Sequence, residues 1–210
     1  MMLIALGTLV SSGFSSVFAR YYGAGQKELG EQSMLSAALL SVFICALLIG
    51  LYNLWGLDLV LKIANGSQSL AQMGDTYLSL TIMYSPLFFM TALLSDSLRC
   101  QGHLAFMTLM SLAANLLNIL FNYILIVQMD MGVAGSAYGT ALAQGTSVLA
   151  VLSYLYLRRD TVRFRFSGFS RLTFNWGQFL ALGAPTSLTY VGVSALIGAT
   201  IFQIQIWNAD

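Results

Sequence analysis

The chain has 210 residues, of which 58% are hydrophobic and only 8% are charged, and its formal net charge at pH 7 is +1. Because soluble domains carry about 25% charged residues, this composition excludes an ordinary soluble protein and indicates a polytopic helical membrane protein. The near-neutral charge argues against a nucleic-acid-binding protein, which needs a basic face. Cys45 and Cys100 lie far apart in the sequence and suggest neither a metal site nor a disulfide framework.

Six apolar segments, each about the 20 residues that cross a bilayer, predict an all-α protein with about six transmembrane helices. In chain order they cover residues 2–20, 33–55, 76–98, 104–128, 133–157 and 178–206. The first segment loosely fits a cleavable signal peptide, but it lacks the basic amino-terminal region of such peptides. After the second segment, residues 57–64 are expected to form a short helix at the membrane interface.

The basic residues predict the orientation. Eight of the nine Lys and Arg residues lie in the first, third and fifth connections between segments, which share one side of the membrane if every segment crosses it. The positive-inside rule makes that side cytoplasmic. The first segment is then expected to begin outside and run inward, as it would if a preceding helix were missing.

Near the inner end of the third segment, Asp96 precedes Arg99 by three residues, a spacing that favours an interfacial ion pair over a role in transport. Pro86 and Pro185 fall inside predicted spans, where each removes a backbone hydrogen bond and can bend its helix. The sequence has no nucleophile–base pair, no HExxH and no phosphate-binding glycine loop, so an enzyme is not expected.

The fourth segment contains three asparagines, Asn115, Asn118 and Asn122, in the stretch AANLLNILFNYILI. Their i, i+3, i+7 spacing places them on one stripe of a helix. Unpartnered amides are costly in hydrocarbon, so the stripe should face protein or a water-filled cavity. The residues alone leave two interpretations open: hydrogen bonds that hold helices together, and a cation or proton site within the bundle.

The fifth segment is rich in small residues. Gly135, Gly139 and Ala143 repeat at four-residue spacing, which predicts close packing against a neighbouring helix. Thr140 and Gln144 are the polar exceptions, and Thr140 is the better candidate to line a cavity.

Three stretches, in order, resemble the multidrug and toxic compound extrusion (MATE) transporter family. GTLVSSGFSSVFARYYGAGQKELGE resembles the family's second helix and first inner loop, and SLRCQGH resembles the turn after its fourth helix. NLLNILFNYILIVQMDMGVAGSAYGTALAQ resembles its fifth and sixth helices. The resemblance implies a partial two-lobe bundle containing helices two to seven of twelve. Residues 1–157 would belong to the amino-terminal lobe, 158–176 to the basic cytoplasmic inter-lobe loop, and 177–210 to the first helix of the carboxy-terminal lobe.

The resemblance also implies a function, that of a cation-coupled antiporter exporting drugs or organic cations by alternating access. Asn118, Asn122 and Thr140 match family positions that line a cation cavity. Their oxygens suit Na+, so Na+ at Asn118 and Asn122 is the only metal expected. A proton would need an acid, and the matching helix-one Asp lies outside this chain. Some members carry a Glu on helix seven, but the span after Pro185 has no acid, which puts coupling there in doubt.

The expected protein is a multi-pass component of the plasma (inner) membrane, monomeric when full length. Its expected partners are small organic substrates and the lipid bilayer, with no nucleic acid and no cofactor beyond the coupling ion, Na+ or H+. Two alternatives stay open. A flippase for lipid-linked oligosaccharides from the wider superfamily would need a strongly basic central cavity. A non-transporting remnant is the other, because half of a lobe pair cannot enclose an alternating-access cavity.

Overall fold

The structure is a computed structural model that describes residues 2–63, 68–158 and 175–207. Within these ranges the chain is helical apart from short turns and contains no strand. In chain order the elements are α1 (Met2–Gly23), α2 (Lys27–Ile63), α3 (Gln68–Met83), α4 (Ser85–Cys100), α5 (Leu104–Asn122), the π-helix η1 (Tyr123–Gln128), α6 (Gly132–Leu157) and α7 (Trp176–Trp207). Five spans are long and apolar enough to cross a membrane, and the bent pair α3–α4 makes a sixth. The predicted fold class, an all-α membrane protein, is therefore confirmed.

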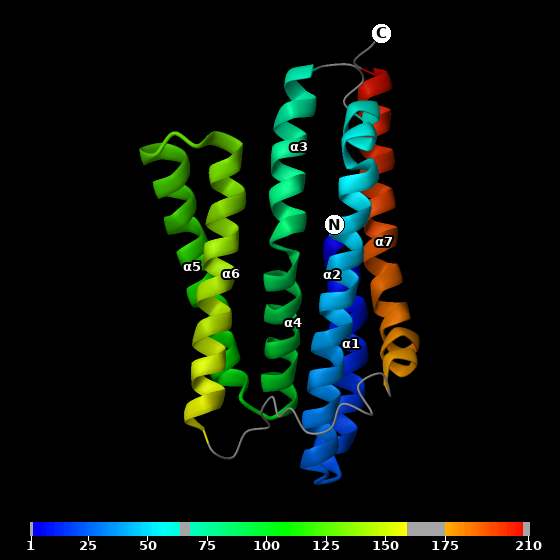
Figure 1. The fold of residues 1–210 in the computed structure, drawn as a ribbon, viewed down its shortest axis with the longest axis vertical. Coiled ribbons are helices and arrows are strands. Elements are labelled where there is room, and N and C mark those ends of the chain that lie inside the picture. The colour runs from blue at the N-terminus through cyan, green and yellow to red at the C-terminus, as the bar shows by residue number, and fades with distance from the viewer. Residues whose placement is uncertain (1, 64–67, 159–174, 208–210) are drawn as a thin grey trace.

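The spans lie side by side in one bundle (Figure 1). The α5–α6 pair forms one flank, α1, α2 and α7 form the other, and α3–α4 stands between them. Successive spans run in opposite directions, so the ends of α1, α4 and α6 lie together at the bottom of the view. This is the end that the basic residues predict to be cytoplasmic.

The connections predicted after α2 and after α6 have different outcomes. The interfacial helix expected at residues 57–64 is wrong, because α2 runs unbroken to Ile63. No proline lies between residue 56 and the end of α2 at Ile63, so no residue there forces the helix to stop earlier. The basic loop expected at 158–176 falls almost entirely on residues 159–174, which lie outside the described ranges.

A break divides the third predicted span. α3 and α4 meet at Tyr84 and differ in direction by 49°. Pro86 lies in the first turn of α4, where a missing backbone N–H is tolerated. Because that N–H is missing and the ring clashes with the preceding turn, α3 cannot continue through Pro86 as a regular helix. The bend expected near Pro86 is therefore present, whereas α7 continues as one helix through Pro185.

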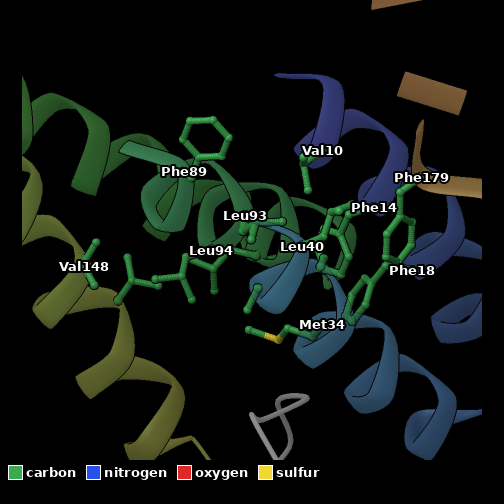
Figure 2. Packing of buried hydrophobic residues seen from close by; sticks show 14 of the residues in the cluster. Val10, Phe14, Phe18, Met34, Leu40, Phe89, Leu93, Leu94, Val148 and Phe179 are labelled. Atoms are coloured by element: carbon green, nitrogen blue, oxygen red, sulfur yellow. The ribbon is translucent and has the colours of Figure 1, made fainter. Parts of the chain in front are cut away.

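The hydrophobic core is centred on α1, α2 and α4 and extends to α6 and α7 (Figure 2). Phe14 and Phe18 of α1 have ring centroids 5.1 Å apart, and Phe14 meets Phe179 of α7 edge-on at 6.3 Å. Such edge contacts between aromatic rings add about 0.5–1.5 kcal/mol to the packing of the rings. In a bilayer this van der Waals packing, rather than exclusion of water, holds the helices together.

α1 and α7 cross at backbone distance because glycines leave room at the crossing. A methyl group placed on Gly13 would overlap the carbonyl oxygen of Phe179, and one placed on Gly183 would overlap the carbonyl oxygen of Leu9. Each glycine therefore faces the backbone of the other helix. The crossing joins α7 to the rest of the described bundle, whichever lobe α7 belongs to in the whole protein.

The start of α7 is also fastened to α2. Asn175 Nδ2 donates a hydrogen bond to Ser33 Oγ at 3.0 Å, and Trp176 Nε1 donates one to the carbonyl oxygen of Ser36 at 3.1 Å. Asn175 and Ser33 are both buried. α7 is thus held at two levels, by polar contacts at its start and by the glycine crossing further along.

The glycine crossing gives a direct stability prediction. Gly13→Ala and Gly183→Ala should each lower the free energy of unfolding by about 1–3 kcal/mol, because a methyl group forces the two backbones apart. Gly23→Ala in α1 and Gly192→Ala in α7 are matched controls, since a methyl group at either position meets no atom within 4 Å. These controls should gain up to about 1 kcal/mol from helix propensity. Denaturation in detergent–lipid micelles measures all four, and equal midpoints would contradict the close crossing.

Candidate functional site

The three site residues predicted from the sequence lie together between α5 and α6. Asn118 and Asn122 occupy the last two turns of α5, and Thr140 faces them from α6. The two helices are antiparallel neighbours joined by the turn at residues 129–131 (Figure 1). The site is therefore formed by elements close in sequence.

A continuous chain of hydrogen bonds connects these side chains. Asn122 Nδ2 donates to Asn118 Oδ1 at 3.2 Å, and Asn118 Nδ2 donates across to Thr140 Oγ1 at 3.1 Å. Thr140 Oγ1 in turn donates to the carbonyl oxygen of Ser136, one turn back on α6, at 2.9 Å. All of these groups are partly buried. The chain explains how a very apolar segment accommodates two amides, since each finds a polar partner inside the protein.

One acceptor in this cluster lacks a partner. Asn122 Oδ1 is buried and accepts no hydrogen bond from the described residues. A carbonyl oxygen of this kind can accept two hydrogen bonds, and leaving it unpaired costs about 1–3 kcal/mol. Buried acceptors left open in native structures call for an explanation such as an ordered water or an ion. Asn118 Oδ1, by contrast, already accepts the hydrogen bond from Asn122 Nδ2.

The small residues of α6 allow α5 to approach this closely. Gly135, Gly139 and Ala143 are buried, and a methyl group on Gly139 would overlap Asn122 Oδ1. A methyl group on Gly135 would lie 3.1 Å from the carbonyl oxygen of Leu125. The close packing predicted from the four-residue spacing is confirmed.

The π-helix η1 that follows Asn122 was not predicted from the sequence. In η1 the backbone bonds reach back five residues, and at its end Met129 N donates to the carbonyl oxygen of Ile124 at 3.0 Å. Such wider turns within helices occur frequently at functional sites. The sequence YILIVQ contains no glycine or proline, so no residue marks the change of winding. Asn122 thus lies where α5 changes its hydrogen-bonding pattern.

The remaining polar candidates lie elsewhere. Asn115, the third asparagine of the predicted stripe, is exposed and lies outside the network. Asp96 and Arg99 form the expected i, i+3 ion pair at the inner end of α4, with 3.4 Å between Asp96 Oδ1 and Arg99 Nη1. In the part of the chain that the structure describes, no group of three or more His, Cys, Asp and Glu side chains could hold a metal ion.

Comparison with known proteins links this arrangement to a family. A family model described as MatE matches residues 1–124. Multidrug and toxin extrusion protein 1 of Danio rerio is 27% identical over 192 residues, which cover 88% of this chain and 31% of that protein. The protein of the same name from Oryctolagus cuniculus is 29% identical over 192 residues, covering 88% of this chain and 32% of its own. The chain therefore spans about a third of the length of the curated relatives it matches.

Solved structures with the same fold include two states of a multidrug resistance MATE family transporter of the MOP superfamily. The inward-facing structure has a TM-score of 0.79 and 23% identity over 90% of this chain and 43% of its own. The outward-facing structure has a TM-score of 0.80 and 23% identity over 94% of this chain and 44% of its own. At this identity the likeness establishes the fold.

The amide–hydroxyl contact between the helices predicts an energetic coupling. Asn118→Ala and Thr140→Val, made singly and together, should show a coupling energy of about 0.6–1.7 kcal/mol, the range known for hydrogen bonds between transmembrane helices. The matched cycle pairs Asn115→Ala with Thr140→Val and should be additive, because Asn115 is exposed. Unfolding free energies in detergent–lipid micelles give both values. Additivity in the Asn118 cycle would show that the contact carries no stability.

Proposed function

Since the chain belongs to the multidrug and toxic compound extrusion family, we propose that it is part of a transporter that exports small organic molecules in exchange for an inward-moving cation. The substrate class is taken from the names of its relatives, which are multidrug and toxin extrusion proteins. The chain spans about a third of those relatives, so the substrate cavity needs the rest of the bundle. The proposed setting is the plasma membrane, with the full-length protein acting as a monomer.

The observation that carries the cation part is the open oxygen of Asn122 within the cluster formed with Asn118 and Thr140. A bound cation would need both amide oxygens, but Asn118 Oδ1 now accepts a hydrogen bond from Asn122 Nδ2. Binding would therefore turn the Asn122 amide and lengthen or break that bond. A local rearrangement of this kind is what gives an ion different affinities for two states, and only that difference can drive transport.

A contact between two aromatic rings supports a link from α6 to the bend in the bundle. Tyr138, on the same turn of α6 as Thr140, packs edge-on against Tyr84 with 6.0 Å between ring centroids. Tyr84 is the residue at which α3 and α4 diverge by 49°. A shift of α6 on ion binding would reach the bend through these two rings. In the proposed cycle this movement disfavours substrate binding while the two lobes alternate between inward- and outward-open states.

The coupling role predicts a loss of export. Asn118→Ala with Asn122→Ala should reduce the efflux of a cationic dye about tenfold or more, because the variant loses both amide oxygens. Asn53→Ala is the matched control, since Asn53 is exposed and donates only to the carbonyl oxygen of Ile49 on its own helix. Cells expressing the full-length transporter, given Na+ and H+ gradients separately, provide the assay. Export at the parental rate by the double variant, at equal expression, would overturn the proposal.

A further inference from the structure

Gln144 of α6 carries a second buried oxygen without a partner. Its Oε1 atom is buried and accepts no hydrogen bond from the described residues, as is true of Asn122 Oδ1. Within the described α5–α6 pair these two side-chain amide oxygens are the ones that are buried and accept no hydrogen bond. The proposed coupling site uses Asn122 but leaves Gln144 without a role.

Gln144 lies on the same face of α6 as the coupling cluster. It follows Thr140 by four residues, which places it about 6 Å further along the helix on the same side. α6 runs toward the end of the bundle predicted to be cytoplasmic (Figure 1), so Gln144 lies one turn inward from Thr140. Leu142 and Leu149 are exposed, and helical geometry puts Gln144 on the opposite side of α6 from both. The amide therefore points into the protein.

Gln101 is a buried glutamine whose side chain is hydrogen-bonded within the protein, in contrast to the open oxygen of Gln144. Gln101 is buried, and its Nε2 donates a hydrogen bond to Ser97 Oγ at 2.8 Å. Gln144 has a buried oxygen that is left open, at a price of about 1–3 kcal/mol. Gln144 Oε1 is thus an open amide oxygen about one helical turn along α6 from Thr140, and a cation passing on that face would satisfy it.

We propose that Gln144 is a further oxygen ligand on the ion's path, receiving Na+ from the Asn118–Asn122–Thr140 cluster as it moves toward the cytoplasm. The inference rests on the proposed function of that cluster. No Asp or Glu occurs in residues 104–128 or 132–157, so α5, η1 and α6 offer only neutral oxygens to the path. Neutral amide and hydroxyl oxygens bind a hard cation, whereas a proton needs an ionisable group.

The test is Na+ binding to the full chain in lipid nanodiscs, with choline replacing Na+ at constant ionic strength and pH. Thermal unfolding is followed as Na+ is raised, because an ion that binds only the folded state raises the midpoint with concentration. Gln144→Met removes the oxygen at similar volume and should raise the half-saturating Na+ concentration about tenfold. Gln144→Glu keeps an oxygen, adds a negative charge, and should bind Na+ at least as tightly as the parent.

Two further variants separate the outcomes. Gln178→Met makes the same change at an exposed position of α7 and should leave Na+ binding unchanged. Asn118→Ala reports on the coupling cluster itself. If Asn118→Ala weakens Na+ binding but Gln144→Met does not, the role of Gln144 is overturned and the cluster stands. If Gln144→Met lowers the unfolding midpoint equally in Na+ and choline, Gln144 is a packing residue. If neither Asn118→Ala nor Gln144→Met changes the Na+ response, the proposed coupling site fails and the role of Gln144 fails with it.

Discussion

The constraint on which this structure depends is that a polar group in hydrocarbon must find its partner inside the protein. Most hydroxyl groups meet it within their own helix, as Ser41 does by donating to the carbonyl oxygen of Ala37 and Thr91 to that of Leu87. Such hydroxyl groups need no partner from another helix, because a backbone carbonyl one turn back accepts their hydrogen bond. Asn118 instead reaches across to another helix. The candidate site is thus one of the places where a polar side chain is not satisfied within its own helix, and here the partner comes from α6.

Close approach of helices has one physical origin at both flanks of the bundle. On one flank Gly13 and Gly183 let α1 and α7 meet backbone to backbone, and on the other Gly139 lets α6 lie directly under the Asn122 amide. In the first case the space serves packing alone. In the second case the space brings the amides of α5 within hydrogen-bond reach of α6. The absence of a side chain thus allows tight packing at one crossing and a polar contact between helices at the other.

Much of this could be predicted from the sequence. Segment length and charge gave the spans, and the spacing of Asn118 and Asn122 with the resemblance to a known family gave the cluster with Thr140. These succeed because hydrophobic length and helical periodicity are local properties. The function of the cluster remains a proposal.

Other features were beyond sequence reasoning, each for a physical reason. The π-helix after Asn122 contains no glycine or proline that would mark a change of winding. The bend is centred at Tyr84, two residues before the proline that suggests it. The open oxygen of Gln144 is a property of its surroundings, which only coordinates reveal.

The length of α2 has a consequence for the outer surface. With 37 residues the helix is about 55 Å long, whereas the hydrocarbon layer is about 30 Å thick. Even a strongly tilted α2 therefore extends beyond the hydrocarbon layer. In Figure 1 the upper ends of α2, α3 and α7 rise above the turn between α5 and α6. The described part of the chain is therefore uneven at this end, with α2, α3 and α7 standing higher than the α5–α6 turn.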